Sequence, residues 1–390
     1  MPELPVDIPL DILEKVISHI NLLDLNKLAA TSKYVLNVIK SQINTFGLDR
    51  DLDSDEIITS FQMNGQYLFI CRQRTDTLLL DKVQIIDIKT GIEIDCLDSP
   101  YTYSINTIPN NDYILSSNHE DKVNLWKYDT GQRKFINNFL FTNPEVNDSE
   151  ITSQNISKDG TLIAIAIVMP NDTNQVVIYK VENNNNVQKN RFLVNNINFD
   201  IIYSIHFVQG LDNKKYLVCV GLDYIDLYDY DQIPDQIPDQ IDDIVPNVTQ
   251  NATKIYNTTD KSDEKLIRAI AVNDNYIAYC LFDYTVNIYD FAKKQKVISF
   301  RIDKFDYSRY RLFQYPFIIT DDNMLIIGGN SITIRQGPNF KDIVQEIKIK
   351  SEYLAYNKET SIIATMCNGD RIVRFINLAN ISRMEKMHHG

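Results

Sequence analysis

The sequence predicts a mainly β protein with a small α-helical unit at its N-terminus. Three observations lead to this fold class. Helical periodicity is confined to the first 44 residues, and from Ile57 onward short segments rich in Ile, Val, Tyr and Phe alternate with Asn, Asp and Gly. Along that second stretch one strand pattern recurs seven times. We therefore expect a helical unit followed by a large repetitive β domain.

The helical unit, residues 1–44, is predicted to contain three short helices. Apolar residues at i, i+3, i+4 and i+7 give the first helix one buried face, made of Leu13, Val16, Ile17 and Ile20. Asp24 and Ser32 are suitable N-caps for a second and a third helix. A unit of this size does not bury a self-sufficient core, so it needs a surface to pack on.

The β domain, residues 57–387, consists of one repeating unit. Each copy has a strand, a tight turn, an apolar strand, and then Asp or Asn followed by an alternating strand. The residue pairs that anchor the copies are Asp81 with Ile86, Asp121 with Trp126, Asn174 with Tyr179, Asp223 with Tyr228, Asp283 with Tyr289, Asn330 with Arg335, and Asp370 with Phe375. Four antiparallel strands repeated seven times, roughly every 40 to 60 residues, predict a seven-bladed β-propeller.

Ahead of each anchor lies a pair of apolar segments that we expect to form the first two strands of a blade. The seven pairs are IITSF with YLFIC, YSINTI with YILSS, ITSQNI with LIAIAIV, IYSIHF with YLVCVG, IRAIAV with YIAYCL, RLFQYP with MLIIGG, and EYLAYN with SIIATM. Residues 231–243, DQIPDQIPDQIDD, form a low-complexity acidic insertion. Its regularly spaced prolines exclude a helix or an interior strand, so it is expected to loop out of the fourth blade.

A propeller must close its ring, because closure removes exposed strand edges. Residues 45–56 are either a short linker or a ring-closing strand. In the second case residues 43–48 pair with the last blade from the N-terminal side; otherwise residues 381–387 complete that blade alone. The sequence leaves both possibilities open.

The charge balance limits the classes of partner. With 39 basic and 52 acidic residues the chain carries a net charge of −13. Binding to nucleic acid requires Lys and Arg to neutralise phosphates, so the composition argues against nucleic acid and equally against an anionic membrane surface. No segment is long and apolar enough to span a bilayer, and no secretory signal is visible, so we expect an intracellular protein in the cytoplasm or the nucleus.

Nothing in the sequence predicts an enzyme, a metal site or a cofactor. The five cysteines are scattered singly, which is typical of buried thiols in a reducing compartment: Cys71, Cys96, Cys219, Cys280 and Cys367. None of the five histidines has a metal-ligand spacing or a nucleophile beside it in the sequence. We therefore expect a non-catalytic protein.

Five arginines are candidates for target binding. In a propeller the loops between the second and third strands share one face with the loops between blades. We expect Arg72 and Arg74 in the first kind of loop, and Arg268, Arg309 and Arg311 in or beside the second. Guanidinium groups gathered there could grip a phosphorylated or acidic peptide. The competing interpretation is that these side chains are simply solvated.

The N-terminal residues resemble a known family. The order Ile8-Pro9-Leu10, Ile12-Leu13, Ile17-Ser18, Asp24-Leu25, Leu28 and Ser32-Lys33 is similar to the F-box, the motif that docks proteins on the Skp-family adaptor of cullin-based ubiquitin ligases. This chain has Val35 where the family often has tryptophan. The resemblance implies that the chain binds a Skp-family adaptor and, through this adaptor, a cullin. The adaptor-binding residues that it implies are Ile8, Pro9, Leu10, Ile12, Leu13, Ile17, Leu25 and Leu28.

The β domain resembles the WD repeat, with SSNHEDKVNLW as the best copy. The copies are degenerate, since only one anchor strand ends in Trp and no Gly-His pair precedes a first strand. The anchor Asp residues are therefore expected to brace their own turns through side-chain-to-backbone bonds.

Two functions follow from these expectations. In the first, the chain is the substrate-recognition subunit of an SCF-type ubiquitin ligase, whose propeller binds a target protein of unknown identity. In the second, the chain is a propeller scaffold without a link to ubiquitin, and its helices only cap the ring.

Overall fold

The computed structural model forms a closed ring. It describes residues 45–47, 56–74, 83–88, 93–97, 102–107, 113–118, 122–129, 134–142, 150–168, 174–181, 187–194, 201–210, 214–230, 252–258, 262–304, 316–367 and 372–378. The predicted helical unit (1–44), the acidic insertion (231–243), and Arg309 and Arg311 lie outside these residues. None of the helices among the described residues has the length and hydrophobicity that a bilayer crossing needs.

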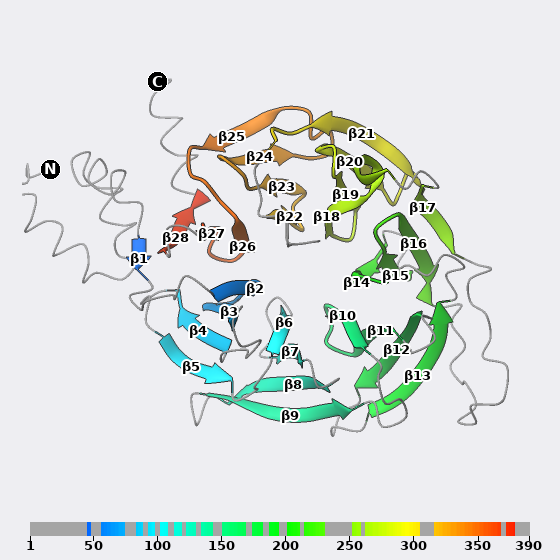
Figure 1. The fold of residues 1–390 in the computed structure, drawn as a ribbon, viewed down its shortest axis with the longest axis vertical. Coiled ribbons are helices and arrows are strands. Elements are labelled where there is room, and N and C mark those ends of the chain that lie inside the picture. The colour runs from blue at the N-terminus through cyan, green and yellow to red at the C-terminus, as the bar shows by residue number, and fades with distance from the viewer. Residues whose placement is uncertain are drawn as a thin grey trace, which may run out of the picture.

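Seven four-stranded antiparallel sheets are arranged around a central axis (Figure 1). This confirms the predicted mainly β fold and the seven-bladed propeller. We number the sheets as blades 1 to 7 in chain order, and in each blade the first strand lies nearest the axis (Figure 1). The ring has two faces. The lower face carries the connections from first to second and from third to fourth strands, and the upper face carries the second-to-third connections and those between blades.

The strands have the following bounds, blade by blade. Blade 1 consists of β2 (Glu56–Asn64), β3 (Tyr67–Arg74), β4 (Val83–Asp87) and β5 (Glu93–Leu97). Blade 2 consists of β6 (Thr102–Thr107), β7 (Tyr113–Asn118), β8 (Lys122–Asp129) and β9 (Lys134–Thr142). Blade 3 consists of β10 (Glu150–Ile156), β11 (Leu162–Val168), β12 (Asn174–Val181) and β13 (Val187–Val194). Blade 4 consists of β14 (Ser204–Gln209), β15 (Lys215–Val220), β16 (Tyr224–Asp229) and β17 (Thr253–Asn257).

The short 3-10 helix η3 (Asp263–Lys265) precedes blade 5, which consists of β18 (Ile267–Val272), β19 (Tyr276–Leu281), β20 (Thr285–Asp290) and β21 (Gln295–Arg301). Blade 6 consists of β22 (Phe317–Ile319), β23 (Met324–Ile327), β24 (Ile332–Gln336) and β25 (Ile343–Ile347). Blade 7 consists of β26 (Tyr353–Asn357), β27 (Ile362–Met366), β28 (Ile372–Asn377) and β1 (Thr45–Gly47).

The last blade is closed from the N-terminal side. The strand β1 pairs antiparallel with β28, with Thr45 opposite Arg374 and Gly47 opposite Ile372. The outer strand of the seventh sheet therefore comes from the other end of the sequence. Of the two closures that the sequence allowed, the structure adopts the one through residues 43–48.

The hydrophobic core lies between the blades. Successive side chains of a strand point to opposite faces of its sheet, so a strand inside a blade buries both faces. In β11, Leu162 packs in a cluster with side chains of blade 4, whereas Ile163 packs in a cluster with side chains of blade 2. This explains why second strands such as LIAIAIV are apolar throughout instead of alternating.

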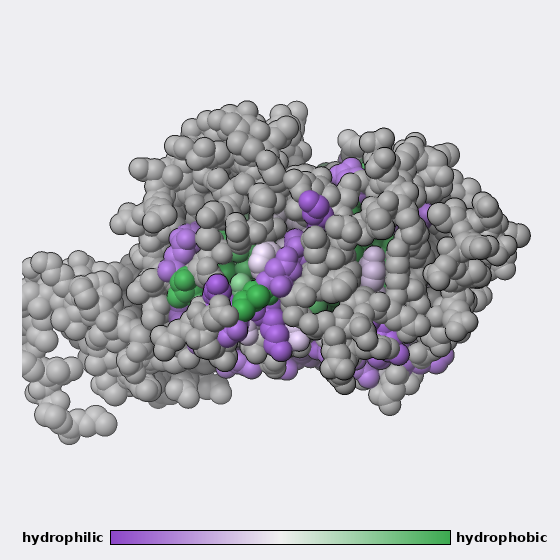
Figure 2. All heavy atoms as spheres, turned by 90° about the horizontal axis from the view of Figure 1, so that it is seen from below, coloured by the Kyte–Doolittle hydropathy of each residue, from purple (hydrophilic) through white to green (hydrophobic). Residues whose placement is uncertain are grey.

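The outer rim exposes few large apolar side chains. Among the described residues only Ile94, Ile343 and Val344 exceed a third exposed, at 39%, 48% and 59%. Figure 2 shows one side of the ring, where hydrophilic residues are scattered among a few hydrophobic ones on the described surface. The rim therefore offers no large apolar patch there for a partner.

Two sequence predictions of local structure were wrong. The first strand of blade 6 is Phe317–Ile319 and not the segment RLFQYP that ends at Pro316. Pro316 has no N–H to donate to a ladder, and its carbonyl instead accepts a bond from Gly328 N (2.8 Å) just before the strand begins. Arg72 and Arg74 lie in β3 and not in the following loop, because β3 extends to pair with Glu56–Ile58.

Two details show what remains of the WD-repeat pattern. The indole Nε1 of Trp126 donates to Ser116 Oγ (2.8 Å) in the buried interior of blade 2. In blade 5 the carboxylate of Asp283 accepts a bond from the backbone N–H of Thr285 (2.9 Å), which confirms the expected turn brace at this anchor. One degenerate copy thus keeps a buried polar pair, and another keeps only the turn.

We expect Trp126→Phe to lower the free energy of unfolding by about 1–3 kcal/mol, because it leaves the buried Ser116 hydroxyl without its donor. The single variant Ser116→Ala should also destabilise, since it orphans the indole N–H. The double variant should lose less free energy of unfolding than the two single variants together, because the two residues are in direct contact. Urea denaturation followed by circular dichroism measures all three, and additive losses would contradict a pairwise bond.

Candidate functional site

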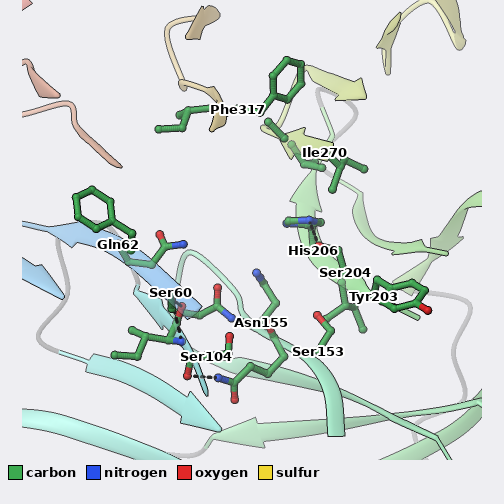
Figure 3. A pocket seen from close by; sticks show the side chains of 18 of the residues that line it. Ser60, Gln62, Ser104, Ser153, Asn155, Tyr203, Ser204, His206, Ile270 and Phe317 are labelled. Atoms are coloured by element: carbon green, nitrogen blue, oxygen red, sulfur yellow. Dashed lines mark hydrogen bonds between the residues drawn. The ribbon is translucent and has the colours of Figure 1, made fainter. Parts of the chain in front are cut away.

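A cavity runs along the central channel of the described structure. Its volume is about 720 Å³, and the innermost strands of all seven blades contribute to its wall. Two kinds of side chain divide the wall between them (Figure 3). Blades 1 to 4 supply hydroxyl, amide and imidazole groups, such as Ser60, Gln62, Asn155 and His206. The lining residues of blades 5 to 7 are apolar except for two tyrosines, and they include Ile270.

Many polar groups at the channel join neighbouring blades. The inner edge of each first strand has no strand to pair with, so its backbone groups need side-chain partners. Side chains on the adjacent blade supply them. The bonds are Ile105 N to Ser60 Oγ, Asn106 Nδ2 to Gln154 O, Gln154 Nε2 to Ser104 O, Phe207 N to Asn155 Oδ1, Gln209 N to Asp274 Oδ1, Asn273 Nδ2 to Thr320 O, and Asn357 Nδ2 to Gly65 O. These residues therefore hold the ring together before they do anything else.

The channel wall is almost uncharged. Among the described lining residues there is no lysine or arginine, and Glu150 is the one carboxylate. Burial lowers the pKa of His206 to about 4, so its imidazole is neutral at physiological pH. A ligand inside this channel would be held by neutral hydrogen bonds and apolar contacts.

Ser204 and His206 form the one pair in the channel that resembles a nucleophile with its base. Ser204 Oγ and His206 Nε2 are 2.7 Å apart. A general base works best when its pKa lies near the working pH, and burial has moved this imidazole well below that. At this pKa the imidazole is neutral but a weak general base. Among the described residues no group of three or more His, Cys, Asp or Glu side chains could hold a metal ion.

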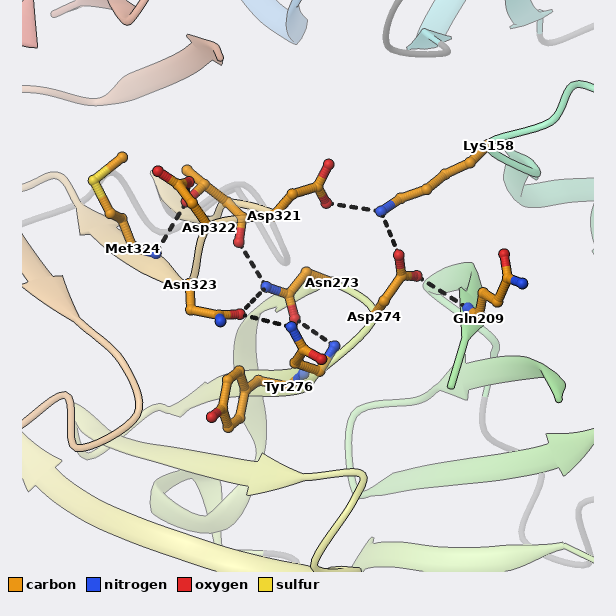
Figure 4. A network of polar contacts seen from close by, with 11 residues as sticks. Lys158, Gln209, Asn273, Asp274, Tyr276, Asp321, Asp322, Asn323 and Met324 are labelled. Atoms are coloured by element: carbon orange, nitrogen blue, oxygen red, sulfur yellow. Dashed lines mark hydrogen bonds and ion pairs between the residues drawn. The ribbon is translucent and has the colours of Figure 1, made fainter. Parts of the chain in front are cut away.

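A cross-channel ion pair lies at the lower face (Figure 4). Lys158, in the first turn of blade 3, places its Nζ 2.7 Å from Asp274 of blade 5 and 2.7 Å from Asp321 of blade 6. Burial lowers the pKa of Lys158, but hydrogen bonds to the two carboxylates outweigh this and raise it. The Lys158 side chain is 47% exposed, so each pair contributes little stability by itself. Its effect is geometric, because it links blade 3 to two blades across the ring.

The predicted arginine cluster is only partly visible. Arg268 is described, and it does not line the channel. Its guanidinium lies over the rings of Phe282 (5.6 Å) and Tyr284 (5.0 Å) of the same blade. The side chains of Arg72 and Arg74, and all of Arg309 and Arg311, lie outside the described residues. A binding face for anionic peptides therefore stays a prediction.

The sequence reasoning missed the polar half of the channel and Lys158. The first strands of blades 1 to 4 carry repeated Ser, Thr, Asn and Gln, as in SFQMN and ITSQNI, whereas those of blades 5 to 7 do not. This contrast was a usable signal, because the first strand of each blade lines the channel. Lys158 had no sequence signal, since its partners lie 116 and 163 residues away.

Comparison with protein families identifies the N-terminal part of the chain. Residues 6–47 match the F-box domain. The chain thus joins an F-box domain to a seven-bladed β-propeller. The predicted adaptor-binding residues, Ile8 to Leu28, fall inside this match but outside the residues that the structure describes. No curated protein matches the chain.

A solved structure supports the propeller fold. The structure titled "Structure of U3-55K" superimposes with a TM-score of 0.55 at 10% sequence identity. The match covers 79% of this chain and 87% of that one. At this identity the likeness concerns the fold alone, and it is consistent with the WD-repeat-like pattern of the sequence.

We expect the free energy of unfolding to rise with pH between about 4 and 6.5 through His206. Its pKa is depressed in the folded state and close to 6.5 when unfolded, so the unfolded chain binds the extra proton in this window. His206→Gln should remove this slope. Urea midpoints, read from the fluorescence of Trp126, the one tryptophan in the sequence, measure it.

Asp226 serves as the matched control, because burial raises its pKa to about 6. Its folded form holds a proton that the unfolded chain releases, so it makes stability fall as pH rises from about 4 to 6. Asp226→Asn should therefore change the slope in the opposite direction to His206→Gln. Parallel pH profiles for wild type and the His206 variant would contradict a lowered pKa of the His206 imidazole at the channel wall.

Proposed function

We propose that this protein is the substrate-recognition subunit of an SCF-type ubiquitin ligase. The observation that supports this most is the F-box match at residues 6–47 in the same chain as a seven-bladed propeller, whose closing strand β1 lies at the end of the match. F-box domains dock on Skp-family adaptors, and a propeller offers a rigid ring of loops for binding another protein. The two parts together suit a receptor that links a target to the ligase through the adaptor and its cullin.

In this function the chain itself forms and breaks no bonds. It raises the effective concentration of a target lysine near the ubiquitin-loaded enzyme that the cullin recruits. In the channel, burial lowers the pKa of the His206 imidazole beside Ser204 to about 4, which makes it a weak general base. The uncharged channel favours target contacts made through neutral hydrogen bonds and apolar surface. Recognition of an anionic peptide depends on Arg72, Arg74, Arg309 and Arg311.

The double variant Leu13→Asp with Ile17→Asp should abolish co-purification of the Skp-family adaptor. Both side chains lie on the predicted apolar face of the first helix, and central apolar anchors of an interface cost about 2 kcal/mol or more each when lost. Pull-down of purified adaptor by the full-length protein measures the effect. The unfolding temperature of the propeller, followed by Trp126 fluorescence, should stay unchanged.

Lys15→Asp is the matched control. It places the same charge on the same predicted helix, but opposite the apolar face, so it should retain the adaptor. If the double variant retains the adaptor as well, the receptor proposal is wrong. The propeller would then be better explained as a scaffold whose helices cap the ring.

A further inference from the structure

The F-box match and the propeller share residues. The match extends to residue 47, and β1, the outer strand of blade 7, spans Thr45–Gly47. All three residues of the ring-closing strand therefore belong to the stretch that matches the F-box. No linker separates the two units at this point.

The direction of β1 shows from which face the chain enters the closing strand. The strand β28 starts at the upper face, because it follows the second-to-third strand connection of its blade. Gly47 pairs with Ile372 at that start, and Thr45 pairs with Arg374 two residues further toward the lower face. The chain thus enters β1 from the side of the lower face, which carries Lys158, and leaves it at the upper face.

The closing strand is short. Among the outer strands of the seven blades, β1 has three residues, whereas the others have five to nine. A three-residue ladder holds few backbone hydrogen bonds, and such strands open readily. Binding that holds β1 in place should therefore raise the stability of the propeller measurably.

The remaining contacts between blades 7 and 1 keep the ring together when β1 opens. Val373 and Phe375 of β28 are buried in one apolar cluster with blade 1 side chains such as Leu68 and Ile70. The side chain of Asn357 also donates to the carbonyl of Gly65 across the same seam. Loss of β1 should consequently weaken the propeller rather than unfold it outright.

We propose that the end of the F-box is the closing strand of the propeller, so that adaptor docking and ring closure are one linked equilibrium. This rests on the proposed function, since it assumes that the F-box binds an adaptor. Because Thr45–Gly47 belong both to the F-box match and to blade 7, a partner that binds the F-box also acts on β1, and this favours the paired state of β1. Linkage is reciprocal, so a closed ring must also favour the adaptor.

Two proline variants of the full-length protein test the closing strand without any adaptor. Neighbouring N–H groups of a strand point to opposite sides, so of Thr45 and Phe46 one donates toward β28 and the other points away. Proline removes that N–H. We expect one of Thr45→Pro and Phe46→Pro to lower the Trp126 fluorescence transition by several degrees more than the other. Equal, negligible shifts in both variants would overturn the closing role of β1.

Addition of purified Skp-family adaptor tests the linkage. Ligands that bind only the native state raise its unfolding temperature. The adaptor should raise the propeller transition of the wild type and of the milder proline variant, and it should raise that of the disruptive variant less. An adaptor that co-purifies with the wild type but leaves the transition unchanged would overturn the linkage and leave the proposed function standing.

An adaptor that fails to co-purify with the wild type would overturn the proposed function and the linkage together. The comparison of the two proline variants would still decide whether the F-box end closes the ring. The two failures are therefore distinguishable, because one is read from the pull-down and the other from the unfolding temperature without adaptor.

Discussion

Closure of the ring is the constraint on which the rest of this structure depends. Seven sheets around an axis leave their first and last members unpartnered unless the two ends of the chain meet. Here they meet at blade 7, where β1 pairs with β28, and at the seam with blade 1, where Tyr353 and Phe375 share an apolar cluster with Phe61. Because the core lies between blades, each blade is buried only when both neighbours are in place. A gap at one seam would thus expose apolar surface on two blades.

Closure also creates the channel and determines its chemistry. The inner edges of the seven first strands face the channel and pair with no strand, so their backbone groups need side-chain partners. Amides and hydroxyls such as Asn106 and Asn273 fill this need from the adjacent blade. Of these bonding residues, Ser60, Asn106 and Gln154 also line the channel and make part of its wall polar and uncharged. Lys158 ties three blades together at the lower face. Structural bonds and the surface offered to a ligand are therefore made by overlapping sets of residues.

The period of the sequence was enough to predict the propeller, because each blade repeats the same alternation of apolar strands and turn residues. Local sequence patterns did not predict the strand boundaries that depend on tertiary contacts. Pro316 looked like the end of a strand, yet it lies just before β22, and Arg72 looked like a loop residue until the pairing with Ile58 extended β3. The contacts at the channel join residues 45 to 292 positions apart, such as Lys158 and Asp321, which are 163 positions apart, so no local pattern reveals them. The F-box was recognisable because its apolar spacing is contained within one short segment.

The overlap of the F-box match with the closing strand β1 connects the proposed adaptor-binding unit to the propeller. Hydrogen exchange of the full-length protein, followed by mass spectrometry, measures the pairing of β1 with β28 most directly, through peptides that cover residues 43–50 and 370–378. If β1 closes the ring, the amide that Thr45 or Phe46 directs at β28 should exchange more slowly than in an unstructured peptide, in step with the outer amides of β28. Exchange of residues 45–47 at the rate of an unstructured peptide, beside a protected β28, would contradict the account.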